Sequence, residues 1–352
     1  MRRHPRWPAS VLAVALTASL AACSSDGTHP DDGTPPTVGF VHANAQLQFS
    51  LEMAEGFTSG VQDVGGVRHE VAAPPMVDGP AQVKILDRMR STATDGISVF
   101  TLSPALFAAP MAQARQAGVP MIAVDNPPPA SSDVTLFVGN DNYEMGRQLA
   151  AEVIAQLPAD ATGKIVIGTA APGVPVLDQR VNGMRDEFRA RRPGIRVLGP
   201  FDTKQDLTAM ARAWQALVHA NPTALAFLGT AEGDGATLAR IRRETGGTWT
   251  AAAFDLNPDD LTAVKQGGLV LMSPEHFVKG AIAGRLQAEA ARTGQGLPEG
   301  WLYTPGLLVN HANIDDIIAR QASVGAKRAW FAGHIDRILG DPAHLRPLAS
   351  AR

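Results

Sequence analysis

The stretch VPMIAVDN, residues 119–126, decides how this chain is organised. Its apolar residues are bounded by Gly118 on one side and by three consecutive prolines, residues 127–129, on the other. This pattern is typical of a short buried parallel strand. In open α/β sheets, ligands gather beyond the carboxyl ends of such strands. We therefore expect Asp125, the residue on which the strand ends, to face a small ligand.

Working outward from this strand, apolar runs alternate with segments of helical spacing from Thr37 onward. The predicted strands lie at residues 38–41, 68–71, 97–102, 121–124, 136–138, 164–168, 197–198, 224–228 and 250–254. Repeated strand–helix units predict parallel sheets with right-handed crossovers, and 352 residues suit two domains. The expected fold class is α/β, with two Rossmann-like lobes.

The second lobe repeats the ending of the first, because the run AAAF at residues 251–254 stops on Asp255 before Asn257-Pro258. Carboxylates at strand ends accept strong hydrogen bonds from ligand hydroxyl groups. An alternative is that each aspartate caps the turn or helix that follows it, and Asp255 is well placed for this.

The N-terminus has the features of an export signal. Arg2, Arg3 and Arg6 precede an apolar run, residues 11–20, that is too short to span a bilayer. The following LAAC, residues 20–23, resembles the bacterial lipobox, which implies a lipoprotein signal peptide at 1–22 and lipid attachment at Cys23. Cys23 is the only cysteine, so no internal disulfide can form. The alternative is a plain signal peptide with an incidental cysteine.

Residues 24–36 are polar or Gly and Pro throughout, so residues 23–36 are expected to form a flexible linker behind the lipid anchor. Without residues 1–22, the chain keeps 28 basic and 34 acidic residues, a net charge of −6. Such a balance argues against nucleic acid as a partner, because phosphate binding needs a basic face.

Known catalytic motifs are missing from the sequence. It contains no Gly-x-Ser-x-Gly elbow, no Walker loop and no His-Glu-x-x-His. The run that begins at Asp255 starts like a calcium loop, but its sixth position is Asp260 and its twelfth is Gln266, so it lacks the required Gly and Glu. We expect no enzyme activity, no metal and no cofactor.

Several motifs together resemble the periplasmic sugar-binding proteins of the ribose-binding, type I class. They are Phe49 with Glu55-Gly56, residues 118–125, residues 139–146, Arg180-Val-Asn-Gly183, Ala253-Phe-Asp255 and the helix at Gly280. The resemblance runs from about Thr37 to Ser323. It implies a solute receptor of an ABC importer, in which two lobes joined by a three-segment hinge close on a monosaccharide or related polyol.

The resemblance also implies the binding residues. Asp125, Arg180 and Asp255 would bind sugar hydroxyl or ring oxygens, and Phe49 would stack on the ring. The full expected set is Gln46, Phe49, Asp125, Asn126, Arg180, Thr230, Asp255 and Glu275. Without the family, the default interpretation of Arg180 is a solvated helix charge, and Phe49 is equally well a core residue. Asn126 and Asp178 replace arginines that are common in the family, which makes ribose itself a doubtful ligand.

By the same likeness, the first lobe comprises residues 37–140 and 275–303, and the second comprises 141–274 and 304–324. Residues 325–352 are an extension with apolar residues at roughly helical spacing. The expected protein is a monomeric, extracytoplasmic lipoprotein, anchored to the cytoplasmic membrane through Cys23, that delivers ligand to an ABC permease. The alternatives are a ligand-sensing subunit for a receptor kinase or chemoreceptor and, more remotely, a sugar hydrolase or isomerase. A DNA-binding repressor with these lobes is excluded, because the signal and linker occupy the place of its DNA-binding helices.

Overall fold

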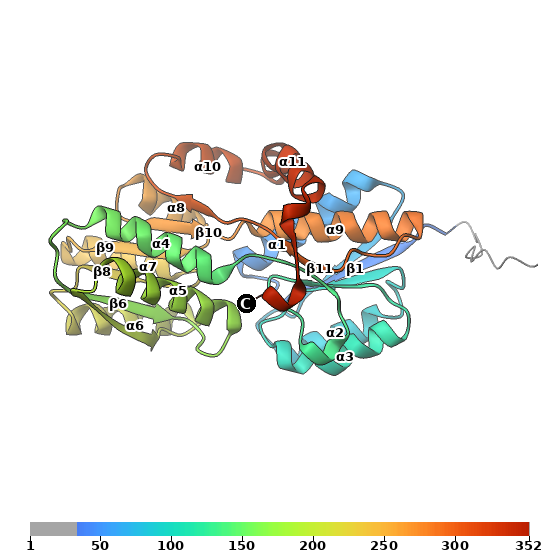
Figure 1. The fold of residues 1–352 in the computed structure, drawn as a ribbon, viewed down its shortest axis with the longest axis horizontal. Coiled ribbons are helices and arrows are strands. Elements are labelled where there is room, and N and C mark those ends of the chain that lie inside the picture. Colours follow the sequence, from blue (N-terminus) through green and yellow to red (C-terminus); the bar gives the residue numbers. More distant parts are fainter. Residues whose placement is uncertain (1–33, 352) are drawn as a thin grey trace, which may run out of the picture. The chain divides into compact units, whose positions relative to one another are not determined.

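The computed structural model describes residues 34–351, whose strands form two separate sheets flanked by helices (Figure 1). The first sheet has the order β13-β11-β5-β4-β3-β1-β2 and is parallel except for β13. Its strands are β1 (Thr37–Val41), β2 (Arg68–Ala72), β3 (Gly96–Val99), β4 (Met121–Val124), β5 (Leu136–Gly139), β11 (Gly300–Tyr303) and β13 (Leu345–Arg346). The helices of this lobe are α1 (Gln48–Val64), α2 (Gly79–Met89), α3 (Pro104–Gln116), α9 (His276–Thr293) and α11 (Val324–Gly340), with short 3-10 turns at Ala130–Ser132, Pro342–His344 and Leu348–Ser350.

The second sheet has the order β12-β10-β9-β8-β6-β7, in which only β12 runs antiparallel to its neighbour. Its strands are β6 (Gly163–Thr169), β7 (Ile195–Asp202), β8 (Ala226–Leu228), β9 (Thr250–Phe254), β10 (Val270–Ser273) and β12 (Leu307–Val309). Its helices are α4 (Asn142–Gln156), α5 (Pro175–Arg191), α6 (Leu207–Ala220), α7 (Asp234–Thr245), α8 (Pro258–Lys265) and α10 (Ile314–Gln321). The predicted α/β class with two lobes is confirmed.

The apolar run of β4 is continuous because this strand is buried on both faces. Ile122 and Val124 contribute to the core on one side of the first sheet, whereas Met121 and Ala123 contribute to the core on the other side. Side chains alternate along a strand, so a central parallel strand covered by helices on both faces needs apolar residues at every position. Asp125, the polar residue that follows β4, therefore lies at the edge of the core.

The chain passes from one sheet to the other between β5 and α4, between β10 and α9, and between β11 and β12. A further passage follows α10. Ile317 of α10 packs in the core of the second lobe, whereas Phe331 and Ile335 of α11 pack in the core of the first. The C-terminal extension thus forms a packed helix, and β13 adds an antiparallel strand to the first sheet.

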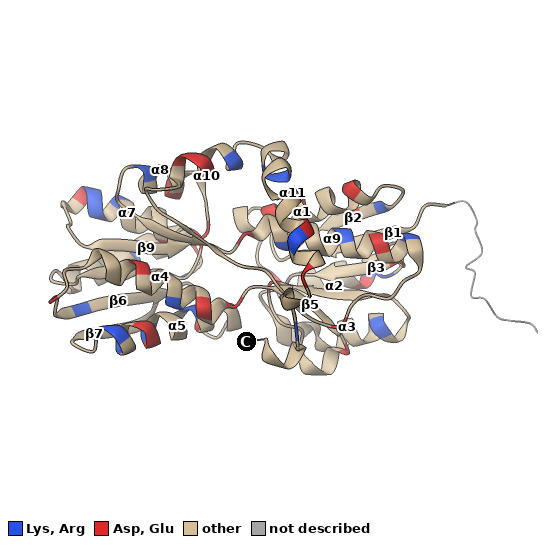
Figure 2. Cartoon of the chain, turned by 45° about the horizontal axis from the view of Figure 1, so that its top comes forward, with Lys and Arg blue, Asp and Glu red and all other residues tan. Residues whose placement is uncertain are grey.

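Lys, Arg, Asp and Glu are interspersed over the elements of both lobes (Figure 2). Within residues 34–351, no helix is long and apolar enough to cross a membrane. The predicted signal peptide, Cys23 and all but the last residues of the predicted linker lie outside the described residues.

Candidate functional site

Asp125 and Asp255 occupy equivalent positions in the two lobes. Asp125 follows β4 and Asp255 follows β9, and both have a left-handed backbone, with φ of 67° and 75°. Aspartate tolerates this conformation better than most residues, and its cost is commonly accepted at functional sites. The backbone N–H of Asp125 donates to Val138 O (2.9 Å) and that of Asp255 to Met272 O (3.1 Å), which anchors each turn to the neighbouring strand.

Both carboxylates line one cavity of about 500 Å³ whose walls come from both lobes. Of the predicted ligand-binding residues, the cavity brings together Gln46, Phe49, Asp125, Arg180 and Asp255. The charged members Asp125, Arg180 and Asp255 are only 3–5% exposed. One strand-end carboxylate from each lobe thus lines the same cavity.

Arg180 is held rigidly by α5 and its neighbours. Its Nε donates to Asn142 Oδ1 (3.0 Å), its Nη1 donates to the carbonyl oxygen of Thr230 (2.7 Å), and the guanidinium lies 4.2 Å above the ring of Phe254. Thr230 contributes to this arrangement through its backbone carbonyl alone. Its hydroxyl bonds to Thr169 Oγ1 (3.1 Å), and its side chain lies outside the cavity lining.

Two glycines allow α5 to approach α4 closely enough for Arg180 to reach Asn142. A Cβ on Gly183 would lie 2.0 Å from Tyr143 O, and one on Gly146 would lie 2.2 Å from Arg180 O. Only glycine permits such backbone contact between helices. The motif residues Gly146 and Gly183 therefore set the position of Arg180.

Lys279 of α9 is a site residue that the sequence interpretation missed. Its Nζ forms an ion pair with Asp125 Oδ1 and donates to Asn140 Oδ1 (2.8 Å), and its side chain is fully buried. Burial is the largest single influence and would raise the pKa of Asp125, but the charge and hydrogen bond of Lys279 together with the nearby His276 and Arg180 outweigh it and hold that pKa below its usual value. A single lysine inside the apolar run FVKGAIAG, residues 277–284, was the available signal.

His276 is the second missed residue, and it connects the two lobes. Its Nε2 lies 2.8 Å from Asp255 Oδ1, its Nδ1 lies 3.9 Å from Asp125 Oδ1, and its ring centroid lies 5.5 Å from that of Phe49. Within the described chain, Nδ1 has no hydrogen-bond partner although the side chain is only 4% exposed. The nine histidines are scattered along the sequence, so spacing could not single this one out.

Glu232, also missed, binds the beginning of α1 from the opposite lobe. Its carboxylate accepts the backbone N–H groups of Gln48 (3.2 Å) and Phe49 (3.0 Å), where a helix N-terminus favours negative charge. Burial nevertheless raises the pKa of Glu232 to about 7, and the nearby charge of Asp255 adds to this effect. These two hydrogen bonds hold the lobes together on one side of the cavity.

Residues 38–291 match the family described as the periplasmic binding protein domain, which is well over half of the chain. The chain belongs to this family. The predicted resemblance is therefore confirmed at the level of family and fold. No protein of curated function matches the sequence significantly.

Solved structures of ABC transporter solute-binding proteins share the fold of this periplasmic binding protein. One from Burkholderia graminis, in complex with D-arabinose, has 23% identity and a TM-score of 0.73 over 80% of this chain and 98% of its own. One from Agrobacterium vitis, with α-D-tagatopyranose, has 23% identity and a TM-score of 0.71 over 80% and 96%. One from Actinobacillus succinogenes, with D-allose, has 18% identity and a TM-score of 0.73 over 80% and 99%.

Besides Thr230, two other predicted residues of this periplasmic binding protein lie outside the cavity lining. Asn126 donates through Nδ2 to Thr101 O (3.0 Å), and it is outside the cavity lining. Glu275, which also lies outside, forms a two-pronged ion pair with Arg320 (2.8 and 3.1 Å) from α10, which occupies both of its oxygens. Glu275 stands at the β10–α9 crossing, so this pair ties that crossing to the second lobe.

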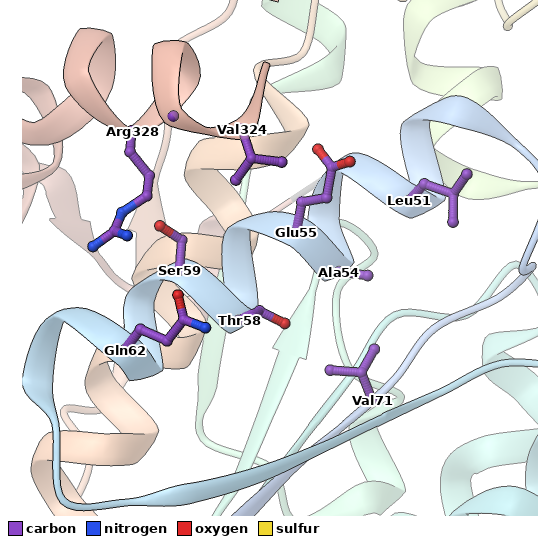
Figure 3. Close-up of a pocket in the computed structure, with 10 residues that line it drawn as sticks. Leu51, Ala54, Glu55, Thr58, Ser59, Gln62, Val71, Val324 and Arg328 are labelled. Carbon is purple, nitrogen blue, oxygen red and sulfur yellow. The ribbon is translucent and has the colours of Figure 1, made fainter.

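A second depression, of about 440 Å³, lies between α1 and α11 (Figure 3). Glu55, Ser59, Val324 and Arg328 line it, and Arg328 is paired with Asp63. It contains none of the strand-end residues. The cavity between the lobes is therefore the candidate ligand site.

Proposed function

We propose that this protein binds a neutral polyhydroxylated small molecule, a monosaccharide or related polyol, and delivers it as the extracytoplasmic receptor of an ABC importer. The observation that carries this proposal is the pair of buried carboxylates, Asp125 and Asp255, that face one cavity from opposite lobes.

The charges at this site suit a ligand without net charge. The carboxylates of Asp125 and Asp255 are balanced by the cations of Lys279 and Arg180. A charged ligand would leave one charge unpaired in a buried site, which is costly. A neutral ligand can form hydrogen bonds to these charged groups through its hydroxyl groups and leaves their charge balance unchanged.

Four polar atoms remain available to such a ligand. Among the described residues, nothing forms a hydrogen bond with Asp125 Oδ2, Asp255 Oδ2, Arg180 Nη2 or His276 Nδ1. Carboxylate oxygens accept from hydroxyl groups, and the guanidinium donates to them. Phe49, beside His276, supplies an apolar ring face for the C–H groups of a sugar.

Ligand contacts to both lobes would favour the closed arrangement, because a ligand shifts a conformational equilibrium by its differential affinity for the two states. The permease would recognise the closed lobes. The crossings between β5 and α4, between β10 and α9 and between β11 and β12 would serve as the hinge for this movement. The family, the solute-binding proteins that share the fold, and the export signal with Cys23 support delivery to an importer from a lipid-anchored position outside the cytoplasm.

Titration calorimetry with a panel of pentoses, hexoses and polyols tests the proposal. We expect one ligand per protein and a loss of about 2 kcal/mol, or about thirtyfold, for Asp255→Ala, because a buried hydroxyl loses a charged partner. Asp255 is preferred to Asp125 for this test because its removal does not leave Lys279 without its carboxylate.

The matched control is Asp259→Ala, which removes an exposed carboxylate four residues further along the chain and should leave the affinity unchanged. Failure of every sugar and polyol to bind would overturn the proposal. Equal affinity of the wild type and Asp255→Ala would remove Asp255 from the site.

A further inference from the structure

We propose that the ligand is amphipathic: a hydroxylated head at the four free polar atoms, joined to an apolar substituent, as in an alkyl or aryl glycoside. This inference rests on the proposed function and narrows its ligand class. It comes from the walls of the cavity away from the strand ends.

Aliphatic side chains from both lobes form these walls. Leu47 and Leu102 contribute from the first lobe, and Val174, Leu177 and Met210 contribute from the second. Leu177 and Met210 are buried, and the other three are half-buried. Among the described residues, Phe49 supplies the only phenyl ring that lines this cavity. A surface of this kind binds apolar groups by burying their area.

Several polar side chains beside these walls already accept hydrogen bonds from the backbone, whereas the side-chain amides of the exposed Gln46 and Gln205 form none with the described residues. Both oxygens of Glu232 accept backbone N–H groups of α1, and Asp206 caps α6 by accepting the N–H of Ala209 (2.8 Å). Asn44 Oδ1 accepts two backbone N–H groups of its own loop, at 2.6 and 2.8 Å. A sugar hydroxyl placed against the aliphatic side chains would lose its water without gaining an equivalent partner. The ligand portion that lies there is therefore expected to lack hydroxyl groups.

The mouth of the cavity carries exposed apolar side chains from both lobes, beside the polar residues Gln46, Gln205 and Asp206. Met76 (69% exposed) and Val77 (36%) come from the first lobe, and Leu207 (62%) comes from the second. They are three of the eight exposed large apolar residues in the part of the chain that the structure describes. Their meeting at one opening, from two lobes, is the pattern expected where an apolar group of a ligand emerges. The volume of about 500 Å³ lies within the range that accommodates drug-sized ligands.

The test pairs free sugars with their glycosides in calorimetric titrations of the protein. The probes are D-glucose, D-galactose and L-arabinose, each compared with its hexyl and 4-nitrophenyl glycoside. We expect at least one glycoside to bind about tenfold or more tightly than its free sugar, because burial of the substituent adds apolar contact.

The variant Leu207→Gln should weaken glycoside binding severalfold while leaving free-sugar binding unchanged. Leu345→Gln is the matched control, because Leu345 is an exposed leucine (40%) on β13 outside the cavity lining. It should change neither affinity.

Tight binding of free sugars together with equal or weaker binding of every glycoside would overturn the inference and leave the proposed function standing. An unchanged glycoside affinity in Leu207→Gln would also overturn it. Binding of neither sugars nor glycosides would instead overturn the proposed function.

Discussion

At the scale of single residues, the candidate site depends on how a few buried charges are paired. Asp125 is 4% exposed, and the amine of Lys279 contacts it from a side chain with no exposure. Pairing of this kind contributes little net stability, yet loss of one partner is strongly destabilising because the other charge stays buried. Asp125 and Lys279 therefore have to be considered as one unit.

Lys279→Met should lower the free energy of unfolding by about 3–5 kcal/mol, since Asp125 would remain buried without its cation. The double variant Lys279→Met/Asp125→Asn should recover most of this loss, because the buried charge is gone. Urea denaturation followed by circular dichroism measures both effects.

Lys265→Met is the control, because Lys265 pairs with Asp315 at side-chain exposures of 59% and 79%. Exposed pairs contribute at most about 1 kcal/mol. If Lys279→Met proved as stable as Lys265→Met, the prediction that loss of the buried cation is strongly destabilising would be wrong.

At the scale of elements, the helix pairs α4–α5 and α1–α9 position the site residues. Gly183 and Gly146 bring α5 against α4, and Gly56 and Gly280 do the same for α1 and α9, where a Cβ on Gly280 would lie 2.0 Å from Met53 O. The first pair carries Arg180, and the second carries His276 and Lys279. The close helix contacts that these glycines permit thus determine where the three site residues lie.

Gly183→Ala should destabilise the protein by about 1–3 kcal/mol, because the added methyl group meets a backbone carbonyl that cannot move aside. It should also weaken ligand binding, since Arg180 lies one turn earlier on the same helix. Thermal unfolding and calorimetry measure the two effects.

Gly333→Ala provides the contrast, because a Cβ at this position of α11 has no atom within 4 Å. It should stabilise the protein slightly, by up to about 1 kcal/mol, through helix propensity. Equal stability changes in the two variants would show that helix contact at Gly183 is unimportant.

At the scale of the whole described chain, the lobes are joined by the crossings and also by side-chain contacts. Glu232 of the second lobe binds the beginning of α1 in the first, and Arg320 of α10 binds Glu275 at the β10–α9 crossing. The extension is fixed to the first lobe, where Lys327 of α11 pairs with Glu52 (3.2 Å) and Glu55 (2.8 Å) of α1.

The Glu232 contact makes stability dependent on pH. Its pKa is about 7 in this structure and 4.5 for the ordinary group, so the folded chain holds more protons than the unfolded chain between these values. The contribution of Glu232 to the free energy of unfolding therefore decreases as pH rises from 4.5 to 7, by up to about 3 kcal/mol. Because glutamine does not titrate, we expect Glu232→Gln to lack this pH-dependent contribution to the free energy of unfolding.

Urea denaturation of the wild type and Glu232→Gln at pH 5 and pH 8 checks the prediction. The variant should gain stability relative to the wild type as the pH is raised. A difference between the two proteins that stays constant with pH would contradict it.

The sequence by itself determined most of the elements and the two aspartates. Apolar runs such as residues 121–124, glycine and proline boundaries and helical spacing are local properties, and they predicted the strands β1 to β9 with the helices between them. The short strands β10 to β13, which complete the two sheets, were not predicted. Asp125 and Asp255 were predictable because each directly follows a strand. The C-terminal helix was predictable from the spacing of Trp330, Phe331, Ile335 and Ile338, but its docking on the first lobe was not.

Only the tertiary structure decided the partners of these residues. Lys279 lies 154 positions from Asp125, and Glu232 lies 183 positions from the amide that it binds, so no local pattern relates them. The same holds for the aliphatic walls of the cavity, whose leucines and valines are indistinguishable from core residues in sequence. Their role depends on which surfaces the two sheets leave facing each other, and that is a property of the packed chain.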